Sequence, residues 1–471
     1  MERQVTYQLW PGTEVLAQEP GHLFYSPLNH KWVLVNEDGR RILDLLQDEI
    51  TIDQLVAECS AYFFVSANAS RPVIETFVEE QVENGIVQMS GNAGRPDWGS
   101  VLSAPTLEQV YLEVTDRCNL RCRYCYNSQE RKRSRTGRAP YLAKEDYLAL
   151  IADLLAMGVS GFVLSGGEPL LCPWIWDIAE ACKLGKARTT LLTNATLVTD
   201  QMADRIVRAF DRVEVSLDSS VEEENDATRG AGTHRRVIRG IKRLVGAGHK
   251  AVVVKPVLST HNVHSIAELP LFVKNVLRCY VHSPSIALPF ESDNGSMDTS
   301  LTPHYELANE ALADFASAHY HCYKGEPKEV LPLGPFLSCG VGKRILCIDS
   351  RGRVYPCQAM HNEKMLCGHL QQQSISEIYE TSAVLRGLSE LWVFDVEKCR
   401  ECKWVLLCGG GCRALAMQLH GRVDAHIEEL CSFMLENGKR TLVEAACREL
   451  SQDRPANLQG RGRHENGRER Y

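Results

Sequence analysis

Three cysteines lie in one short loop, in the stretch TDRCNLRCRYCYN that follows the alternating run QVYLEV. They are Cys118, Cys122 and Cys125, so their spacing is C-x3-C-x2-C. Three thiolates at this spacing can bind one face of an iron–sulfur cube and leave one iron without a protein ligand. The alternative is a zinc knuckle that a distant Cys or His completes, because structural zinc takes four ligands. Spacing alone leaves both kinds of metal site open.

A second short motif, SGGEP at residues 165–169, ends another strand-like run. Gly166 and Gly167 would let the backbone approach a small ligand closely, because glycine has no Cβ. The carboxylate of Glu168 could then receive an ammonium group. Such a motif alone is most often a turn, but here it follows the three-cysteine loop by one predicted strand–helix unit.

A second set of cysteines stands near the C-terminus at short spacings. A pair of zinc ribbons would need eight ligands arranged in C-x2-C pairs, which this pattern does not offer. Within CGGGC, three glycines would let the backbone pass between two metal groups and donate N–H groups to sulfide. The set consists of Cys339, Cys357, Cys399, Cys402, Cys408, Cys412 and Cys431.

The composition is that of an ordinary globular protein with many cysteines. Of the 471 residues, 44% are hydrophobic, and this length predicts domains of roughly 150 residues each. Eighteen cysteines without a signal peptide favour metal sites in a reducing compartment over disulfides, so we expect a cytoplasmic protein. The net charge of −8 predicts no nucleic-acid partner, and no apolar run is long enough to predict a membrane span.

The elements that would position the two short motifs alternate between strand and helix. β-branched runs are interleaved with segments of helical spacing, such as 144–158 and 234–248, which is typical of βα units around a parallel sheet. In such sheets ligands bind beyond the carboxyl ends of the strands, where both motifs fall. The predicted strands are 109–115, 161–166, 188–194, 212–218 and 251–257. Four polar residues after the third and fifth strands could belong to the site or be structural: Thr193, Asn194, Thr260 and Asn262.

The first 90 residues contain one cysteine and predict a small separate domain. A β-branched run at 30–36 predicts a strand, and three helices are predicted at 37–48, 51–63 and from residue 71, the last leading into a short strand. This pattern suggests a winged-helix-like domain, followed by a Gly-, Pro- and Ser-rich linker. The predicted divisions are 1–92, a linker at 93–107, a barrel at 108–325, a cysteine-rich domain at 326–450 and a disordered tail at 451–471.

Together, the C-x3-C-x2-C loop and the GGE motif one βα unit later resemble those of radical S-adenosylmethionine (SAM) enzymes. The resemblance implies an α/β fold with a partial (β/α)6 barrel and a [4Fe-4S] cluster. It also implies that the amino and carboxylate groups of SAM chelate the open iron, and that the reduced cluster cleaves SAM to a 5′-deoxyadenosyl radical. By the same resemblance Tyr124 lies near the adenine, and Gly166, Gly167 and Glu168 hold the SAM amino group.

Three more residues match the SAM contacts of this family. Ser216 and Asp218, in VSLDS, match the ribose and carboxylate region, and Arg229 matches the arginine that pairs with the SAM carboxylate. This agrees with the chemistry, since a zwitterionic amino acid end needs one anionic and one cationic partner. Ser216 could instead be a turn residue and Asp218 a loop cap.

The C-terminal cysteine spacing resembles the SPASM extension of radical SAM enzymes that modify peptides and proteins. The resemblance implies two auxiliary [4Fe-4S] clusters, and so three in the chain. The fourth ligand of the inner cluster would be Cys347, unless an iron stays open and Cys347 is a buried strand residue. By the resemblance the outer cluster takes Cys399, Cys402, Cys408 and Cys431, and the inner one takes Cys339, Cys357 and Cys412.

Residues 20–90 resemble the PqqD-like element by which peptide maturases recognise their precursors. Such domains bind an extended leader peptide as an added strand on a sheet edge. The alternatives are a stabilising domain or a DNA-binding winged helix, and the acidic charge of this segment argues against DNA.

The resemblances together predict a radical SAM maturase of a ribosomally made precursor peptide, served by a flavodoxin- or ferredoxin-type electron donor. The first expected product is a thioether from a Cys sulfur to a carbon of another residue. Carbon–carbon or other side-chain crosslinks and formylglycine formation use similar parts. A different class stays open, a non-catalytic iron–sulfur electron carrier or peptide-binding protein, although it does not explain the GGE motif and Arg229.

Overall fold

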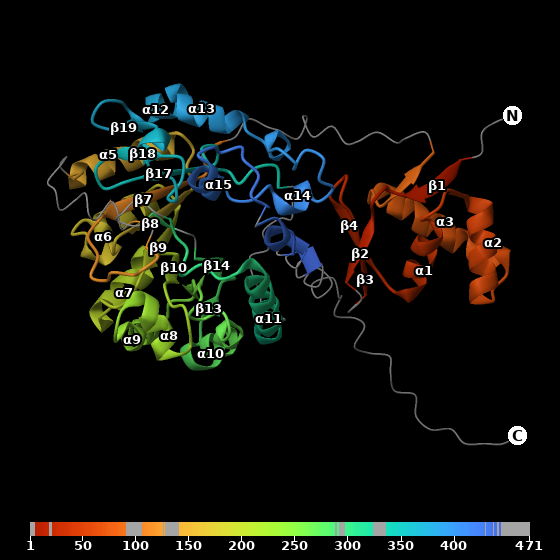
Figure 1. The fold of residues 1–471 in the computed structure, drawn as a ribbon, viewed down its shortest axis with the longest axis horizontal. Coiled ribbons are helices and arrows are strands. Elements are labelled where there is room, and N and C mark those ends of the chain that lie inside the picture. The colour runs from red at the N-terminus through yellow and green to blue at the C-terminus, as the bar shows by residue number, and fades with distance from the viewer. Residues whose placement is uncertain are drawn as a thin grey trace, which may run out of the picture. The chain divides into compact units, whose positions relative to one another are not determined.

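The structure is a computed structural model, shown in Figure 1. It describes residues 5–17, 21–90, 106–125, 127, 141–287, 290–291, 297–323, 336–428, 430–436, 438–439 and 442–443. The predicted tail and most of the predicted linker lie outside these residues. Contacts within the chain divide it into two compact units, one centred on residues 1–96 and one on residues 97–322 and 336–436, and each is described by itself.

The N-terminal unit combines two antiparallel sheets with three helices. One sheet has the order β2-β3-β4 and the other has the order β5-β1-β6. Both predicted strands, which are β4 and β6, and all three predicted helices are present, whereas β1, β2, β3 and β5 were not predicted. The elements are β1 (Thr6–Leu9), β2 (Glu14–Ala17), β3 (His22–Ser26), β4 (Lys31–Val35), α1 (Glu37–Leu45), β5 (Ile50–Thr51), α2 (Ile52–Phe63), α3 (Ala67–Glu83) and β6 (Val87–Met89).

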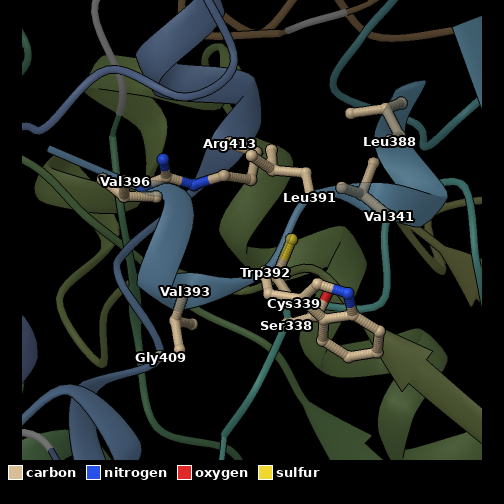
Figure 2. Close-up of a pocket in the computed structure, with 10 residues that line it drawn as sticks. All are labelled: Ser338, Cys339, Val341, Leu388, Leu391, Trp392, Val393, Val396, Gly409 and Arg413. Atoms are coloured by element: carbon tan, nitrogen blue, oxygen red, sulfur yellow. The ribbon is translucent and has the colours of Figure 1, made fainter. Parts of the chain in front are cut away.

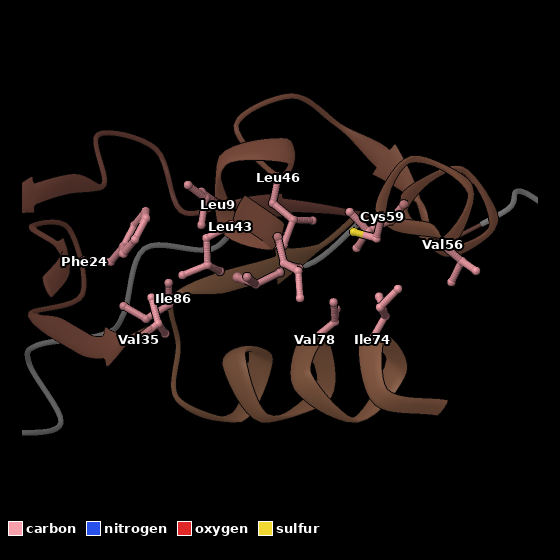
Figure 3. Packing of buried hydrophobic residues seen from close by; sticks show 13 residues of the cluster. Leu9, Phe24, Val35, Leu43, Leu46, Val56, Cys59, Ile74, Val78 and Ile86 are labelled. Atoms are coloured by element: carbon pink, nitrogen blue, oxygen red, sulfur yellow. The ribbon is translucent and has the colours of Figure 1, made fainter. Parts of the chain in front are cut away.

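Side-chain caps begin the first two helices of this unit. The Oδ1 atom of Asn36 accepts the Gly39 N–H at 2.9 Å, and Thr51 and Gln54 form a capping box at the start of α2. The apolar faces of the helices then pack into one core, in which Leu43 and Ile86 are completely buried (Figure 3). Burial of this shared core, rather than the short strands alone, stabilises the unit.

The second unit is built on six parallel strands in the order β13-β11-β10-β9-β8-β7. All five predicted strands are present, and the predicted α/β fold with a partial barrel is confirmed. In β10, Val213 and Val215 are completely buried, while Arg212 and Glu214 point to the other, partly exposed face. The strands are β7 (Gln109–Thr115), β8 (Gly161–Gly166), β9 (Arg188–Thr193), β10 (Arg212–Val215), β11 (Val252–Val254) and β13 (Tyr280–Val281).

The helices follow the strands in the order expected for βα units. They lie around the outside of the strands in Figure 1. The predicted helices at 144–158 and 234–248 correspond to α5 and α9. The helices are α5 (Lys144–Ala156), α6 (Ile175–Leu184), α7 (Asp200–Ala209), α8 (Glu222–Arg229), α9 (Thr233–Gly246), α10 (Leu269–Phe272) and α11 (Tyr305–Tyr323), and short strands β12 (Val257–Leu258), β14 (Ser285–Ile286), β15 (Phe290–Glu291) and β16 (Met297–Asp298) lie between α9 and α11.

The cysteine-rich segment continues the barrel sheet. β17 (Ile345–Ile348) pairs in parallel with β7, and β18 (Arg353–Tyr355) and β19 (Gly368–His369) follow in antiparallel pairing, which gives a nine-stranded sheet. Arg344 adds a two-point ion pair with Glu108 at the start of β7, with N–O distances of 3.0 and 2.7 Å. The two predicted domains of this unit therefore share one sheet along β7.

Short helices carry the rest of the cysteine-rich segment. The CGGGC stretch connects α14 to α15, so that Cys408 ends one helix and Cys412 precedes the next. Among the described residues, no helix is both long and apolar enough to cross a bilayer. The helices are α12 (Ile375–Thr381), α13 (Ala383–Glu390), α14 (Val405–Cys408) and α15 (Arg413–His420).

Candidate functional site

The three-cysteine loop starts where β7 ends, and two other strand–helix units hold it. The backbone N–H of Arg123 donates to the carbonyl oxygen of Thr228 in α8 at 2.9 Å. The side-chain Nδ2 of Asn194, directly after β9, lies 3.9 Å from the sulfur of Cys118. All three thiols are partly exposed, as an open ligand loop requires: Cys118, Cys122 and Cys125.

The two glycines of the GGE motif bring the backbone of β8 against the start of this loop. A Cβ on Gly166 would lie 2.2 Å from the carbonyl oxygen of Thr115, and a Cβ on Gly167 would lie 2.2 Å from that of Arg117. The N–H of Gly167 donates to the Thr115 oxygen at 2.7 Å. The sequence predicted a close approach of these glycines to a small ligand. The structure shows that these glycines lie against the residues just before the cysteine loop and so help to position it, and their approach to a ligand stays a prediction.

The carboxylate of Glu168 lies at the same edge and is almost fully buried, with 1% exposed. It accepts the Thr193 hydroxyl at 2.7 Å, the Asn194 backbone N–H at 2.8 Å and the Leu170 N–H at 3.2 Å. Burial raises the pKa of Glu168 to about 7, although these hydrogen bonds act against the shift. The group can therefore change its charge near neutral pH, and it joins the ends of β8 and β9.

Asp218 and Arg229 are buried and form one cluster with the partly buried Tyr124. The guanidinium of Arg229 binds the Asp218 carboxylate at two points, each 2.7 Å long, and the Tyr124 hydroxyl donates to the same carboxylate. Burial works to lower the pKa of Arg229, but Asp218 outweighs it and holds that pKa well above its usual range. The cluster fixes Tyr124 of the cysteine loop to the end of β10 and to α8.

Arg229 thus binds the carboxylate of Asp218 in this structure. The pairing of Arg229 with the SAM carboxylate remains a prediction. Ser216 lies half-buried at the same edge, and its N–H donates to the carbonyl oxygen of Thr193 at 3.1 Å.

Asn262 and Thr260 follow the fifth predicted strand, and their side chains donate hydrogen bonds to backbone oxygens. Asn262 donates to the carbonyl oxygen of Asp218 at 2.7 Å, and Thr260 donates to that of Ser300 at 3.0 Å. These two contacts support the structural alternative for both residues.

The C-terminal cysteines divide into two groups. Burial and the neighbouring thiols of Cys412 and Cys339 raise the pKa of Cys357 to about 12. The sulfur of Cys339 points into a hollow that Arg413 and Leu391 also line (Figure 2). Thiols so close together are costly to ionise without a cation, so this donor set fits the cationic core of an iron–sulfur cluster. The group is the predicted inner set.

The second group is the predicted outer set. Burial raises the pKa of Cys399 to about 11, with contributions from three cysteine neighbours. The three glycines between Cys408 and Cys412 have φ values of 72°, 72° and 81°, a conformation that other residues rarely adopt. The tight turn that they form separates a member of this group from a member of the inner group. The neighbours of Cys399 are Cys408, Cys402 and Cys431.

Cys347 lies apart from both groups in its nearest contacts. It is completely buried in β17, and its sulfur is 3.5 Å from Nε2 of His361. Glu113 of β7 affects its pKa more than Cys357 does. Its role as a ligand of the inner cluster therefore stays a prediction.

Sequence reasoning missed four residues along β7 and its extension. Asp116, just before the cysteine loop, pairs with Arg351 of the cysteine-rich segment at 3.2 Å, and both side chains are buried. Glu113 and His361 meet at 3.6 Å. Single charged residues far apart in the sequence carry no local pattern, so only the pairing of β7 with β17 brings them together.

Comparison with known families agrees with this architecture. Residues 112–272 match the radical SAM superfamily, and residues 339–403 match SPASM, the iron-sulfur cluster-binding domain. The chain therefore contains a radical SAM domain and a SPASM domain, whose cofactors are SAM and [4Fe-4S] clusters.

Curated relatives match the same part of the chain. Mycofactocin maturase MftC of Mycobacterium tuberculosis is 25% identical over 312 residues, which cover 64% of this chain and 77% of the relative. Fe-coproporphyrin III synthase of Methanosarcina barkeri is 26% identical over 351 residues, covering 67% and 86%.

Solved structures extend the likeness in fold. Streptococcus suis SuiB bound to S-adenosylmethionine has a TM-score of 0.54 at 15% identity, covering 92% of this chain and 99% of SuiB. SuiB has also been solved bound to its precursor peptide SuiA.

Proposed function

We propose that this chain, a radical SAM enzyme with a SPASM domain, modifies a side chain of a ribosomally made precursor peptide. The observation that carries the proposal is the combination of three cysteine groups with a separately folded N-terminal unit. A similar whole-chain fold occurs in SuiB, which binds a precursor peptide.

The residues of the barrel edge have distinct tasks in this proposal. Cys118, Cys122 and Cys125 hold a cluster that, with SAM bound and an electron from a flavodoxin- or ferredoxin-type donor, supplies a 5′-deoxyadenosyl radical. The ionised carboxylate of Glu168 receives the amino group of SAM, and Arg229 orients the carboxylate end of SAM. Both side chains are buried, so little water competes for them.

The N-terminal unit binds the leader part of the peptide. β4 is an edge of the sheet β2-β3-β4 among the described residues, and it contacts the start of α1. A Cβ on Gly39 of α1 would lie 2.9 Å from Val35 and 3.3 Å from Phe77, so strand and helices converge at that point. An extended peptide can add to such an edge as a further strand while a helix forms the other wall of the groove.

The product that we propose first is a thioether between a Cys sulfur and a carbon of another residue. The 5′-deoxyadenosyl radical would take one hydrogen atom from that carbon and become 5′-deoxyadenosine. The carbon–sulfur bond would form as the thiol loses its proton to solvent, and an auxiliary cluster held by the C-terminal cysteines would accept the one remaining electron. The inner group of cysteines supports this assignment, because it lies in the SPASM extension whose sheet continues from β7.

The test uses the full chain and a cysteine-containing peptide encoded next to its gene. We expect mass spectrometry to detect the loss of two hydrogen atoms from the peptide after anaerobic incubation with SAM and a reductant. Amide hydrogen exchange should slow at residues 31–35 when the peptide binds, while α2 serves as an internal control. Unchanged exchange in β4 would contradict leader binding there. Conversion of an iron porphyrin in place of the peptide would contradict the proposed substrate.

A further inference from the structure

Glu113, Cys347 and His361 form a compact cluster that the proposed function does not use. The sulfur of Cys347 is 3.5 Å from Nε2 of His361, and the same nitrogen is 3.6 Å from Oε1 of Glu113. One ligand atom from each of the three residues lies within 4.8 Å of the other two, and no other such group occurs among the described residues. The side chains of Glu113 and His361 are 3% and 10% exposed, and Cys347 is completely buried.

The sheet places these three side chains on one face. Cys347 of β17 pairs with Tyr111 of β7, so Glu113, two residues further along β7, points to the same side. Cys347 also pairs with Tyr355 of β18, and the His361 ring stacks on the Tyr355 ring at 4.4 Å and 15°. The imidazole is therefore oriented by a neighbour that is itself fixed by strand pairing.

The distances agree with those of a single tetrahedral ion. With ordinary zinc–ligand bond lengths, a tetrahedral site places sulfur and nitrogen about 3.5 Å apart and nitrogen and oxygen about 3.4 Å apart. The observed separations are 3.5 and 3.6 Å. A carboxylate and a thiolate together also neutralise a dication, which removes the cost of burying either charge alone.

We propose that Glu113, Cys347 and His361 bind one Zn2+ ion, with water as the fourth ligand. Three protein ligands and one water are the ligand set of an open zinc site, but burial leaves little room for a substrate to reach this ion, so its role would be to hold the three segments together. Glu113 precedes the three-cysteine loop on β7, and Cys357 of the inner group lies between Cys347 and His361 in the chain. The ion would thus fix the position of an inner-cluster ligand relative to the strand that carries the SAM site. This assignment excludes Cys347 as an iron ligand, since one thiolate cannot serve both metals here.

The first experiment measures zinc and iron in the holoenzyme with its iron–sulfur clusters loaded. We expect about one zinc per chain, and zinc K-edge absorption with one sulfur near about 2.3 Å and nitrogen or oxygen near about 2.0–2.2 Å. In Cys347→Ala and in His361→Gln the zinc should fall at least ten-fold while the iron content is unchanged. Cys182→Ala, which removes another completely buried cysteine, should leave both metals unchanged.

Several results would overturn the zinc site. Absence of zinc from the loaded wild-type chain would do so, as would retention of zinc in both variants. A zinc environment of several sulfurs would indicate adventitious binding at cluster cysteines. Loss of iron in Cys347→Ala but not in His361→Gln would assign Cys347 to the inner cluster instead. His361→Gln keeps a polar side chain of similar length, so it tests the site even if Cys347→Ala fails to fold.

Discussion

The two cysteine-bearing regions of the second unit are assembled in different ways. Cys118 to Cys125 belong to one loop, which a strand end, two glycines and the Asn194 side chain hold locally. The C-terminal cysteines come from segments between Cys339 and Cys431, and packing across several short helices gathers them. The position of the first three thiols is therefore set by residues close together in the sequence, whereas the grouping of the C-terminal thiols depends on the surrounding fold.

The two cysteine-bearing regions should also serve different steps of the reaction. In the proposed function the loop region holds one cluster beside Glu168 and Arg229, so we expect it to support SAM cleavage without the auxiliary groups. The C-terminal region contacts the barrel along β7 and would act on the substrate side. Variants in the two regions should accordingly separate cleavage of SAM from modification of the peptide.

The largest effect is expected for Cys122→Ala. Loss of one of three ligands should remove the SAM-binding cluster, and release of 5′-deoxyadenosine should drop to the level without enzyme. Chromatography of the reduced, SAM-treated protein measures this release. Cys182→Ala is the matched control and should retain full release, so an equal loss in both variants would contradict a specific role for the loop.

A large effect on stability is expected for Arg229→Ala. The change leaves the carboxylate of Asp218, which is 2% exposed, without its cation. Breaking such a buried pair costs about 3–5 kcal/mol of unfolding free energy. The exposed pair Arg235–Glu222, with a similar N–O distance of 2.8 Å, provides the control. Arg235→Ala should cost less than about 1 kcal/mol. Thermal unfolding compares the two, and equal shifts would show that Asp218 is stabilised by other groups.

An effect of intermediate size is expected for the dependence of SAM affinity on pH, because Glu168 changes its charge near neutral pH. Because the pKa of Glu168 is raised to about 7, the side chain is mainly protonated at pH 6 and mainly ionised at pH 8. The SAM ammonium prefers the ionised form, so SAM affinity should increase about ten-fold from pH 6 to pH 8. Equilibrium dialysis of the cluster-loaded protein measures it. Glu168→Gln should flatten the profile, and a flat profile in the wild type would limit Glu168 to holding the strand ends.

The smallest effect on SAM cleavage is expected for Cys408→Ala. Iron content should fall by about one [4Fe-4S] cluster, because Cys408 belongs to the outer group, while 5′-deoxyadenosine release should change only a few-fold. Peptide modification should be lost. Cys367→Ala, a cysteine outside both groups, should leave iron content and both activities intact. Complete loss of SAM cleavage in Cys408→Ala would remove the distinction between the two regions.

Much of the barrel could be predicted from the sequence, because its β-branched runs alternate with amphipathic segments. The pairing of β17 with β7 could not, since no local pattern identifies a partner strand more than 200 residues away. For the same reason Glu113 and His361 were not predicted as a pair, although their side chains are only 3% and 10% exposed. Their signal exists only after the strands are paired.

The sequence predicted which residues form the candidate site, but it did not predict most of the contacts between them. The spacing identified the cysteine loop and the GGE motif, but it did not predict that Gly166 and Gly167 lie against the backbone of Thr115 and Arg117. The sequence also did not predict that the guanidinium of Arg229 binds the carboxylate of Asp218. In the N-terminal unit β1, β2 and β3 were missed, because four or five residues give too short a pattern to recognise.

The most direct test of the account is the release of 5′-deoxyadenosine by the full chain, loaded with iron and sulfide and reduced under anaerobic conditions with SAM. We expect release in the wild type, none in Cys118→Ala, and substantial release in Cys399→Ala. A wild-type chain with all clusters loaded that releases no 5′-deoxyadenosine would contradict it.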